Sequence, residues 1–254
     1  IVVSGSNNII INNLITQLSG DSTTYGIYLT GASNTISNNT IKDNGDDGIY
    51  LTGADSNTIS DNTISDNDDS GILLYNAEDN IINNNTIKSN LNGIEIDGGS
   101  GDNIISNNTI IDNDEQGIMF EAGIDNHKFI YNIIKSNGEE GIYLDAMGVD
   151  DITISNNNIS LNGGYGIRGD ELNSLLFINE NIVSNNEDTG IYIRVSLDSR
   201  ITNNNIFSND GYGIDIGLDD RTSGSNVTIS NNTIINNSDG LRIGGETSNE
   251  NTVS

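Results

Sequence analysis

The chain has 254 residues, of which 33% are hydrophobic, with no Cys, Trp or Pro and a formal net charge of -28. The lack of Cys excludes a disulfide framework and a thiolate metal site. The negative charge excludes nucleic acid and anionic membranes as partners, because both require a basic face, and it makes cations the expected partners. No stretch of the sequence is long and apolar enough to span a bilayer, so we expect no membrane insertion.

A unit beginning Gly-Ile or Gly-Leu recurs along the whole chain. Its glycines are Gly26, Gly48, Gly71, Gly93, Gly117, Gly141, Gly166, Gly190, Gly213 and Gly240. Successive glycines are 22 to 27 residues apart, and a nearly fixed period in this range is typical of a repeat architecture. Residues 1–5 match residues 27–31, so the repeat starts at the first residue.

A second alternating run follows within each period, as in the Asn-Thr-Ile-Ser-Asn-Asn-Thr-Ile of residues 34–41. Period-two alternation places Ile27, Leu29, Ile36 and Ile41 on one side, which a helix could not do. Each period therefore predicts three short strands, with the Ile and Leu side chains lining a narrow core. We expect successive coils to stack about 4.8 Å apart.

Two columns of Asn mark corners between the predicted strands. The first holds Asn13, Asn39, Asn62, Asn85, Asn108, Asn132, Asn157, Asn204 and Asn232, with Glu180 interrupting it. The second holds Asn44, Asn67, Asn90, Asn113, Asn137, Asn162, Asn185, Asn209 and Asn237. Asn tolerates the left-handed backbone of a sharp corner, and stacked amides can form ladders. We expect both columns to be structural, each rung contributing about 0.5–1.5 kcal/mol.

With these two units over its full length, the chain resembles the right-handed parallel β-helix repeat proteins. That group includes NosD-like periplasmic and archaeal surface proteins and, more distantly, pectate lyases and polygalacturonases. The resemblance implies an all-β fold, a right-handed parallel β-helix solenoid of about ten three-stranded coils, with residues 1–254 as a single domain. It is specific for fold and weak for function, because the repeat serves lyases, hydrolases, epimerases, adhesins and scaffolds alike.

In the enzymes that the chain resembles, substrate lies along the outer face of one parallel sheet. This makes the outward column of the Gly-Ile-x-Leu strand the place to search, and from Glu95 onward this column mixes Tyr, Arg and acids. Aromatic faces beside carboxylates and guanidinium groups suit sugars. The alternative is that these are ordinary exposed positions of an acidic protein. The predicted carbohydrate-binding residues are Glu95, Tyr143, Arg168, Tyr192, Arg194 and Asp215.

The neighbouring outward column stacks acidic residues. Carboxylates about 4.8 Å apart repel by roughly 1 kcal/mol per adjacent pair even in water, and a hard cation with oxygen ligands relieves this repulsion. Calcium is therefore the one cofactor that we expect, bound weakly. The predicted metal ligands are Asp97, Glu121, Asp145 and Asp170.

Catalytic residues stay unassigned. The chain lacks Gly-His-Gly, Asn-Thr-Asp, Asp-Pro-His and Arg-x-Pro-x-x-Arg, the short motifs of related hydrolases, epimerases and lyases. Lys128 and Tyr131 flank the single histidine, His127, and Lys and Tyr act as bases in lyases, but a lone His in a turn is more often a tolerated substitution. One His, two Met and no Cys offer no soft-ligand cluster for copper, the metal of the NosD-like group.

These features predict an extracellular or cell-surface scaffold or adhesive module that binds polysaccharide or cell-surface glycan along one sheet. The alternative is a polysaccharide lyase, hydrolase or epimerase with its site on that face. Both termini match positions inside a coil. We therefore expect the chain to belong to a longer protein with flanking domains, or to associate end to end with further copies.

Overall fold

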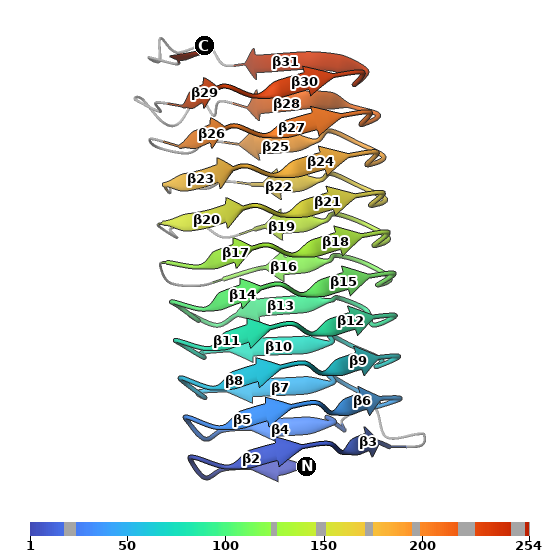
Figure 1. The fold of residues 1–254 in the computed structure, drawn as a ribbon, viewed down its shortest axis with the longest axis vertical. Coiled ribbons are helices and arrows are strands. Elements are labelled where there is room, and N and C mark those ends of the chain that lie inside the picture. The colour runs from blue at the N-terminus through green and yellow to red at the C-terminus, as the bar shows by residue number, and fades with distance from the viewer. Residues whose placement is uncertain are drawn as a thin grey trace.

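The computed structural model describes residues 1–17, 24–122, 126–145, 151–170, 175–194, 199–217, 227–244 and 252–253. They form a parallel β-helix, in which the chain winds through three short strands per coil and the coils stack into a rod (Figure 1). The predicted stack of about ten three-stranded coils is confirmed. Among the described residues no helix is long and apolar enough to cross a membrane.

Three parallel sheets, here called A, B and C, run the length of the rod. Sheet A contains β1 (Val2–Val3), β4 (Ile27–Leu29), β7 (Ile49–Thr52), β10 (Ile72–Tyr75), β13 (Ile94–Asp97), β16 (Ile118–Phe120), β19 (Ile142–Leu144), β22 (Ile167–Gly169), β25 (Ile191–Arg194), β28 (Tyr212–Gly217) and β31 (Asp239–Gly244). Sheet B contains β2 (Ile9–Ile11), β5 (Thr35–Ser37), β8 (Thr58–Ser60), β11 (Ile81–Asn83), β14 (Ile104–Ser106), β17 (Lys128–Ile130), β20 (Ile152–Ser155), β23 (Leu176–Asn179), β26 (Arg200–Thr202), β29 (Thr228–Ser230) and β32 (Thr252–Val253). Sheet C contains β3 (Leu14–Thr16), β6 (Thr40–Lys42), β9 (Thr63–Ser65), β12 (Thr86–Lys88), β15 (Thr109–Ile111), β18 (Ile133–Lys135), β21 (Asn158–Ser160), β24 (Ile182–Ser184), β27 (Asn205–Phe207) and β30 (Thr233–Ile235).

The core is a set of inward columns. Most strands of sheets B and C contribute one central apolar residue, and most strands of sheet A contribute the two apolar residues on either side of an outward one. In sheet B, Ile36 pairs with Ile59 and Ile59 with Ile82, and all three are fully buried. β-Branched side chains pack well on a pleated surface, and each fully buried Ile contributes about 1.5–3 kcal/mol. A chain with a modest apolar content can therefore hold a rod of this length, since almost every inward position carries a large aliphatic side chain.

Asn ladders tie the coils together, as predicted, but each column lies one residue further along than expected in one coil. In the first ladder Asn157 donates from Nδ2 to Asn181 Oδ1 at 3.0 Å, and Asn181 continues to Asn204. Glu180 therefore does not interrupt the ladder. In the second ladder Asn186, not Asn185, joins Asn162 to Asn209.

The left-handed backbone and the ladder belong to adjacent residues. Glu180 has φ 58° and Asn185 has φ 55°, and each precedes the Asn that carries the ladder. The corner needs one residue that accepts positive φ and one buried amide that bonds to its neighbours. Where both positions are Asn, as at Asn185-Asn186, the sequence alone does not tell which of the two joins the ladder.

A third ladder, which the sequence analysis missed, precedes the sheet B strands at Asn8, Asn34, Asn57, Asn80 and Asn103. The next residue in this column is His127, which follows Asn103 in register because Lys128 pairs with Ile104. His127 is fully buried, its Nε2 lies 3.0 Å from the Ser100 carbonyl oxygen, and its ring packs edge-on against Phe120. His127 is thus a structural residue of the corner.

The repeat position requires glycine because atoms of neighbouring residues lie too close to the backbone to leave room for a Cβ. A Cβ on Gly71 would lie 2.5 Å from Ile87 Cγ2, 2.7 Å from the Gly93 carbonyl oxygen and 2.9 Å from Asn90 Nδ2. The neighbours are a core side chain, backbone and a ladder amide, none of which can move freely. The glycine lets the chain turn tightly from the second ladder into sheet A.

Candidate functional site

The outward column of sheet A has the register that the sequence predicts. Tyr143 pairs with Arg168, Arg168 with Tyr192, and Tyr192 with Asp215. The acidic column beside it also stacks as expected, because the backbone N–H of Asp170 bonds to Leu144 O on the preceding coil. Both predicted columns therefore lie on one outer face, which we call face A.

Arg168 is the centre of a polar and aromatic cluster on face A. Its Nη1 lies 3.0 Å from Glu140 Oε1 and its Nη2 lies 2.7 Å from Asp170 Oδ2. The guanidinium carbon lies 4.7 Å from the ring centroid of Tyr143 and 5.4 Å from that of Tyr165. Two carboxylates and two aromatic rings thus hold one cation, at distances where both ion pairing and cation–π attraction operate. We call these five residues the Arg168 cluster.

The tyrosines of the cluster are linked to its charges. Tyr143 donates its hydroxyl to Asp170 Oδ2 at 3.2 Å, and the Tyr165 ring lies 5.3 Å from that of Tyr192, centroid to centroid. Burial raises the pKa of the Tyr143 hydroxyl above its usual range, with Asp145 and Asp170 adding to the shift while Arg168 opposes it. Tyr143 is therefore a neutral hydrogen-bond donor at ordinary pH.

A second ion pair lies two coils further along face A. Arg242 donates from Nε to Asp215 Oδ1 at 2.7 Å and from Nη2 to Asp215 Oδ2, a bidentate arrangement. The Arg242 guanidinium carbon lies 4.8 Å from the ring centroid of Tyr212. The combination of arginine, carboxylate and tyrosine thus occurs twice on face A.

The other predicted sugar-binding residues are placed apart from the Arg168 cluster. Glu95 lies on β13, where it accepts a hydrogen bond from Ser70 Oγ at 2.7 Å, and burial raises its pKa. Arg194 lies at the end of β25, beside Gly217 of the next coil, and forms no ion pair with a described residue. The structure therefore brings together Tyr143, Arg168 and Tyr192, and it separates Glu95 from them.

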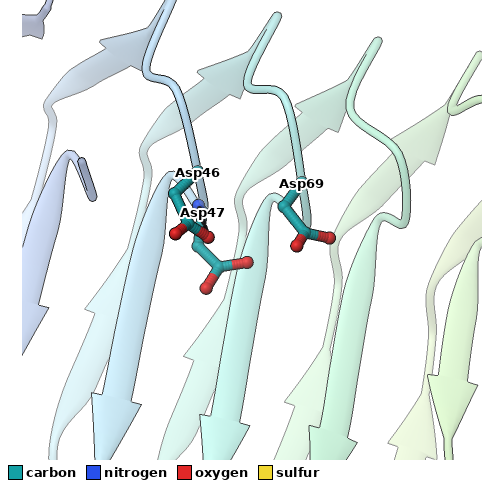
Figure 2. A group of neighbouring side chains, drawn as sticks. All are labelled: Asp46, Asp47 and Asp69. Carbon is teal, nitrogen blue, oxygen red and sulfur yellow. Dashed lines mark hydrogen bonds between the residues drawn. The ribbon is translucent and has the colours of Figure 1, made fainter. Parts of the chain in front are cut away.

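An acidic group that the sequence analysis did not single out lies at the edge of face A. Carboxylate oxygens of Asp46, Asp47 and Asp69 lie within 4.8 Å of one another (Figure 2). Asp47 is only 2% exposed and accepts a hydrogen bond from the Ser70 N–H at 3.0 Å. Burial, followed by the charges of Asp69, Asp46 and Glu95, raises the pKa of Asp47 to about 8.

Oxygen ligands at this spacing suit a hard cation such as calcium. Among the described residues, Asp46, Asp47 and Asp69 are the acidic group whose oxygens converge this closely. The four predicted calcium ligands stack in one column without forming such a group of three, and calcium binding by them stays a prediction. Those four residues are Asp97, Glu121, Asp145 and Asp170.

A family profile described as a right handed beta helix region matches residues 1–148 and 125–254. The chain belongs to the right-handed β-helix family. Comparison of this β-helix protein with curated protein sequences gives no match. The family membership confirms the resemblance derived from the repeat units.

Among solved structures, the Dettilon tailspike protein matches with a TM-score of 0.73 at 15% identity, over 97% of this chain and 61% of its own. The periplasmic alginate epimerase matches with a TM-score of 0.63 at 18% identity, over 90% of this chain and 70% of its own. The A-module of the Azotobacter vinelandii mannuronan C-5 epimerase matches with a TM-score of 0.66 at 17% identity, over 98% of this chain and 79% of its own. At these identities the likeness shows the fold alone. This β-helix spans about three fifths of the tailspike chain.

Face A also carries an aromatic group near the first coils of the β-helix. The ring centroids of Tyr25 and Tyr50 are 4.8 Å apart, and that of Tyr28 lies 5.4 Å from Tyr50. A hollow of about 290 Å³ borders Tyr25 and Tyr28. Aromatic side chains thus occur near the first coils and again in the Arg168 cluster, and Asp46 and Asp47 lie just before β7, the strand that carries Tyr50.

Sequence reasoning missed Glu140 and Tyr165, which complete the Arg168 cluster. Both immediately precede a repeat glycine, and the same position holds Tyr25, Asp47 and Tyr212. Reading this column as a third outward column would have found them. By contrast, Lys128 and Tyr131, which flank His127, lie on sheet B and at its corner with sheet C, away from face A.

Proposed function

We propose that this β-helix is an extracellular or cell-surface scaffold that binds polysaccharide along face A. The observation that carries the proposal is the Arg168 cluster, in which an arginine is held between two tyrosine rings and two carboxylates. Tyrosine rings offer apolar faces to the C–H surfaces of sugars, and carboxylates accept hydrogen bonds from sugar hydroxyl groups. Ordinary exposed charges on an acidic protein would not require this arrangement.

The geometry favours an extended polymer over a small molecule. Outward side chains on face A recur once per coil, and neighbouring strands of a sheet lie about 4.8 Å apart. A linear chain lying along the rod therefore meets a new set of side chains at each coil. The ion pairs and ring contacts already fix the side chains of the Arg168 cluster, so little rotamer entropy is lost on binding.

The comparisons support the same assignment. Two of the structural neighbours are named as epimerases of alginate or mannuronan, and a third is a tailspike. One of the epimerases is named as periplasmic, which agrees with a location outside the cytoplasm for this β-helix. Face A corresponds to the surface of the repeat on which sequence and structure both concentrate Tyr, Arg and acidic residues.

A polysaccharide lyase, hydrolase or epimerase is the second candidate function. The hydrogen bond between the Tyr143 hydroxyl and Asp170, beside Arg168, is the observation that favours it. The raised pKa of Tyr143 weakens it, because a base must lose its proton near working pH. Binding without turnover is therefore the first choice.

A glycan array with the full chain, followed by product assays, tests both candidates. We expect binding without release of reducing ends, unsaturated sugars or epimerised units. Tyr192→Ala should weaken binding about tenfold by removing an aromatic face next to Tyr165. The matched control is Phe177→Ala, an outward aromatic residue on β23 of sheet B.

If both Tyr192→Ala and Phe177→Ala lose binding, or if neither does, face A is not the binding surface. Product release that disappears in Arg168→Ala would establish the enzyme instead. Product release that persists in both Arg168→Ala and Glu95→Ala would place catalysis outside the predicted residues.

A further inference from the structure

The basic residues of this β-helix are divided unequally between its faces. On the described outward positions of sheet A the basic residues are Arg168, Arg194 and Arg242. Sheets B and C carry the lysines, at Lys42, Lys88, Lys128 and Lys135. Recognition of a sugar acid requires an arginine or lysine that can reach the ligand carboxylate. The state of the three arginines therefore decides which sugars face A can accept.

The charge of Arg168 is already matched by two internal carboxylates. Its Nη1 and Nη2 already contact Glu140 and Asp170, and its Nε is buried without a hydrogen-bond partner among the described residues. Glu140 is almost buried, with 8% of its side chain exposed. A ligand carboxylate would have to displace it and leave a buried charge unpaired, which is costly.

Arg242 is also paired with an internal carboxylate, and 52% of its side chain is exposed. Its Nε and Nη2 donate to the two oxygens of Asp215, which is 3% exposed. This bidentate pairing is the geometry that a sugar carboxylate would use. The Tyr212 ring covers the guanidinium at 4.8 Å. An incoming carboxylate would again compete with a fixed internal one.

The surroundings of the Arg168 cluster add repulsion. The acidic column beside it contains Asp97, Glu121 and Asp145. Burial, followed by the charges of Asp97 and Asp145, raises the pKa of Glu121. The whole chain carries a formal net charge of -28. Like charges brought together at an interface weaken binding and slow the encounter.

Resting on the proposed function, we infer that face A selects uncharged polysaccharides and rejects polymers of sugar acids. With both arginines paired internally, face A offers a ligand the remaining oxygen of Asp170, Oδ1, as an acceptor for hydroxyl groups and the tyrosine rings as apolar platforms. Both features match a sugar that has hydroxyl groups and no charge. Arg194, which has no ion pair among the described residues, is a single opposing charge at the end of β25.

Matched polymer pairs test the inference without varying the sugar backbone. Polygalacturonate and polymannuronate are each compared with their fully methyl-esterified forms, by titration of the full chain at low ionic strength and without divalent cations. We expect each ester to bind at least about tenfold more tightly than its acid. Added salt should narrow the difference, because salt screens exposed charges.

A double variant shows whether the acidic column causes the selection. In Glu121→Gln with Asp145→Asn, the acid forms should gain affinity several-fold while the esters change little. The control removes two charges at the corner between sheets B and C, by Asp61→Asn with Glu180→Gln, both at residues with φ 58°. The control should leave the ratio of ester to acid affinity unchanged.

The outcomes separate the inference from the proposed function. Acid forms that bind as tightly as the esters, or more tightly, overturn the selectivity and leave polysaccharide binding standing. If the corner control changes the ratio of ester to acid affinity as much as the double variant does, the role of the acidic column is overturned. No binding of any polymer in the pairs or of any neutral polysaccharide on an array overturns the proposed function, and the selectivity with it.

Discussion

Face A and the outer faces of sheets B and C share one backbone geometry but carry different side chains. In sheet C the outward column runs through Thr40, Thr63, Thr86 and Thr109 and continues as Ile133, Asn158, Ile182, Asn205 and Thr233, without a charged or aromatic residue. At the outward positions of sheet A the residue type changes at almost every coil. That column reads Tyr50, Leu73, Glu95, Met119, Tyr143, Arg168, Tyr192 and Asp215.

Identical residues satisfy stacking well, because like side chains pair across parallel strands without any change of shape. Stacking does not require the tyrosines, arginines and acidic residues of face A, and we attribute them to the binding of a polymer. The contrast teaches that in a solenoid the repeat marks what holds the rod together, while departures from the repeat mark where it acts. Four experiments test this separation, from the largest expected effect to the smallest.

Among the changes that we consider, loss of one ladder Asn should lower the free energy of unfolding most. Asn85 accepts from the Asn62 N–H at 3.0 Å and donates from Nδ2 to Ile59 O at 2.9 Å and to Asn108 Oδ1 at 3.0 Å. We expect Asn85→Ala to lower the free energy of unfolding by about 3 kcal/mol, because it leaves buried partners unsatisfied. Urea denaturation measures the effect.

The control for the ladder is Lys88→Ala, an exposed residue of the same coil, which should change stability by less than about 0.5 kcal/mol. Similar losses in both variants would contradict the idea that the Asn column holds the coils together.

Arg168 should matter to stability as well as to binding. Arg168→Gln leaves the almost buried Glu140 without its cation, and we expect a loss of about 1–2 kcal/mol at neutral pH. Arg200→Gln on sheet B, whose guanidinium lies 5.7 Å from the Phe177 ring centroid, should cost less than about 0.5 kcal/mol. Thermal unfolding of both variants gives the comparison. Equal losses of stability in the two variants would mean that Arg168 on face A is held no more firmly than Arg200 on sheet B.

Asp47 should make the protein less stable as pH rises. Its folded pKa of about 8 lies above the value for an unfolded Asp, so between about pH 4 and pH 8 the folded state binds more protons than the unfolded state. Stability therefore falls with rising pH in this window, by at most about 1.4 kcal/mol per pH unit from this group. Asp47→Asn mimics the neutral form and should flatten the dependence.

Melting temperatures measured across that pH window for the wild type and Asp47→Asn test the expectation. The matched control is Asp61→Asn, an exposed acid at the corner between sheets B and C, which should keep the wild-type slope. A wild-type stability that rises with pH in parallel with Asp47→Asn would contradict the buried, protonated state of Asp47.

We propose that the protein binds calcium weakly, and the resulting gain in stability should be the smallest of the four effects. Calcium at several times its Kd should stabilise the fold by about 1 kcal/mol more than sodium at equal ionic strength. Asp69→Asn abolishes this gain if the group of Asp46, Asp47 and Asp69 binds the ion, and Asp145→Asn abolishes it if the predicted column does. Equal melting temperatures in the two salts would remove calcium as a ligand.

The sequence by itself determined the fold and the order of residues in the core columns and on face A. The period of the repeat glycine and the alternation around residues such as Ile36 and Ile41 place them in the core, where the structure has them fully buried. The order of face A, from Tyr143 through Arg168 to Tyr192, also followed from the period. A strict period fixes these features because each coil repeats the same backbone path.

Only the tertiary structure decided what meets across a corner. Glu140 and Arg168 are 28 residues apart, longer than one repeat, and they touch because the chain bends at the repeat glycine and brings the preceding residue of one coil beside the next coil's strand. The corners on either side of the sheet C strand likewise decide that Asn181 and Asn186, not their neighbours, join the ladders. Alternation along a strand says nothing about the angle between strands, and that angle results from the packing of glycine, core Ile and ladder Asn together.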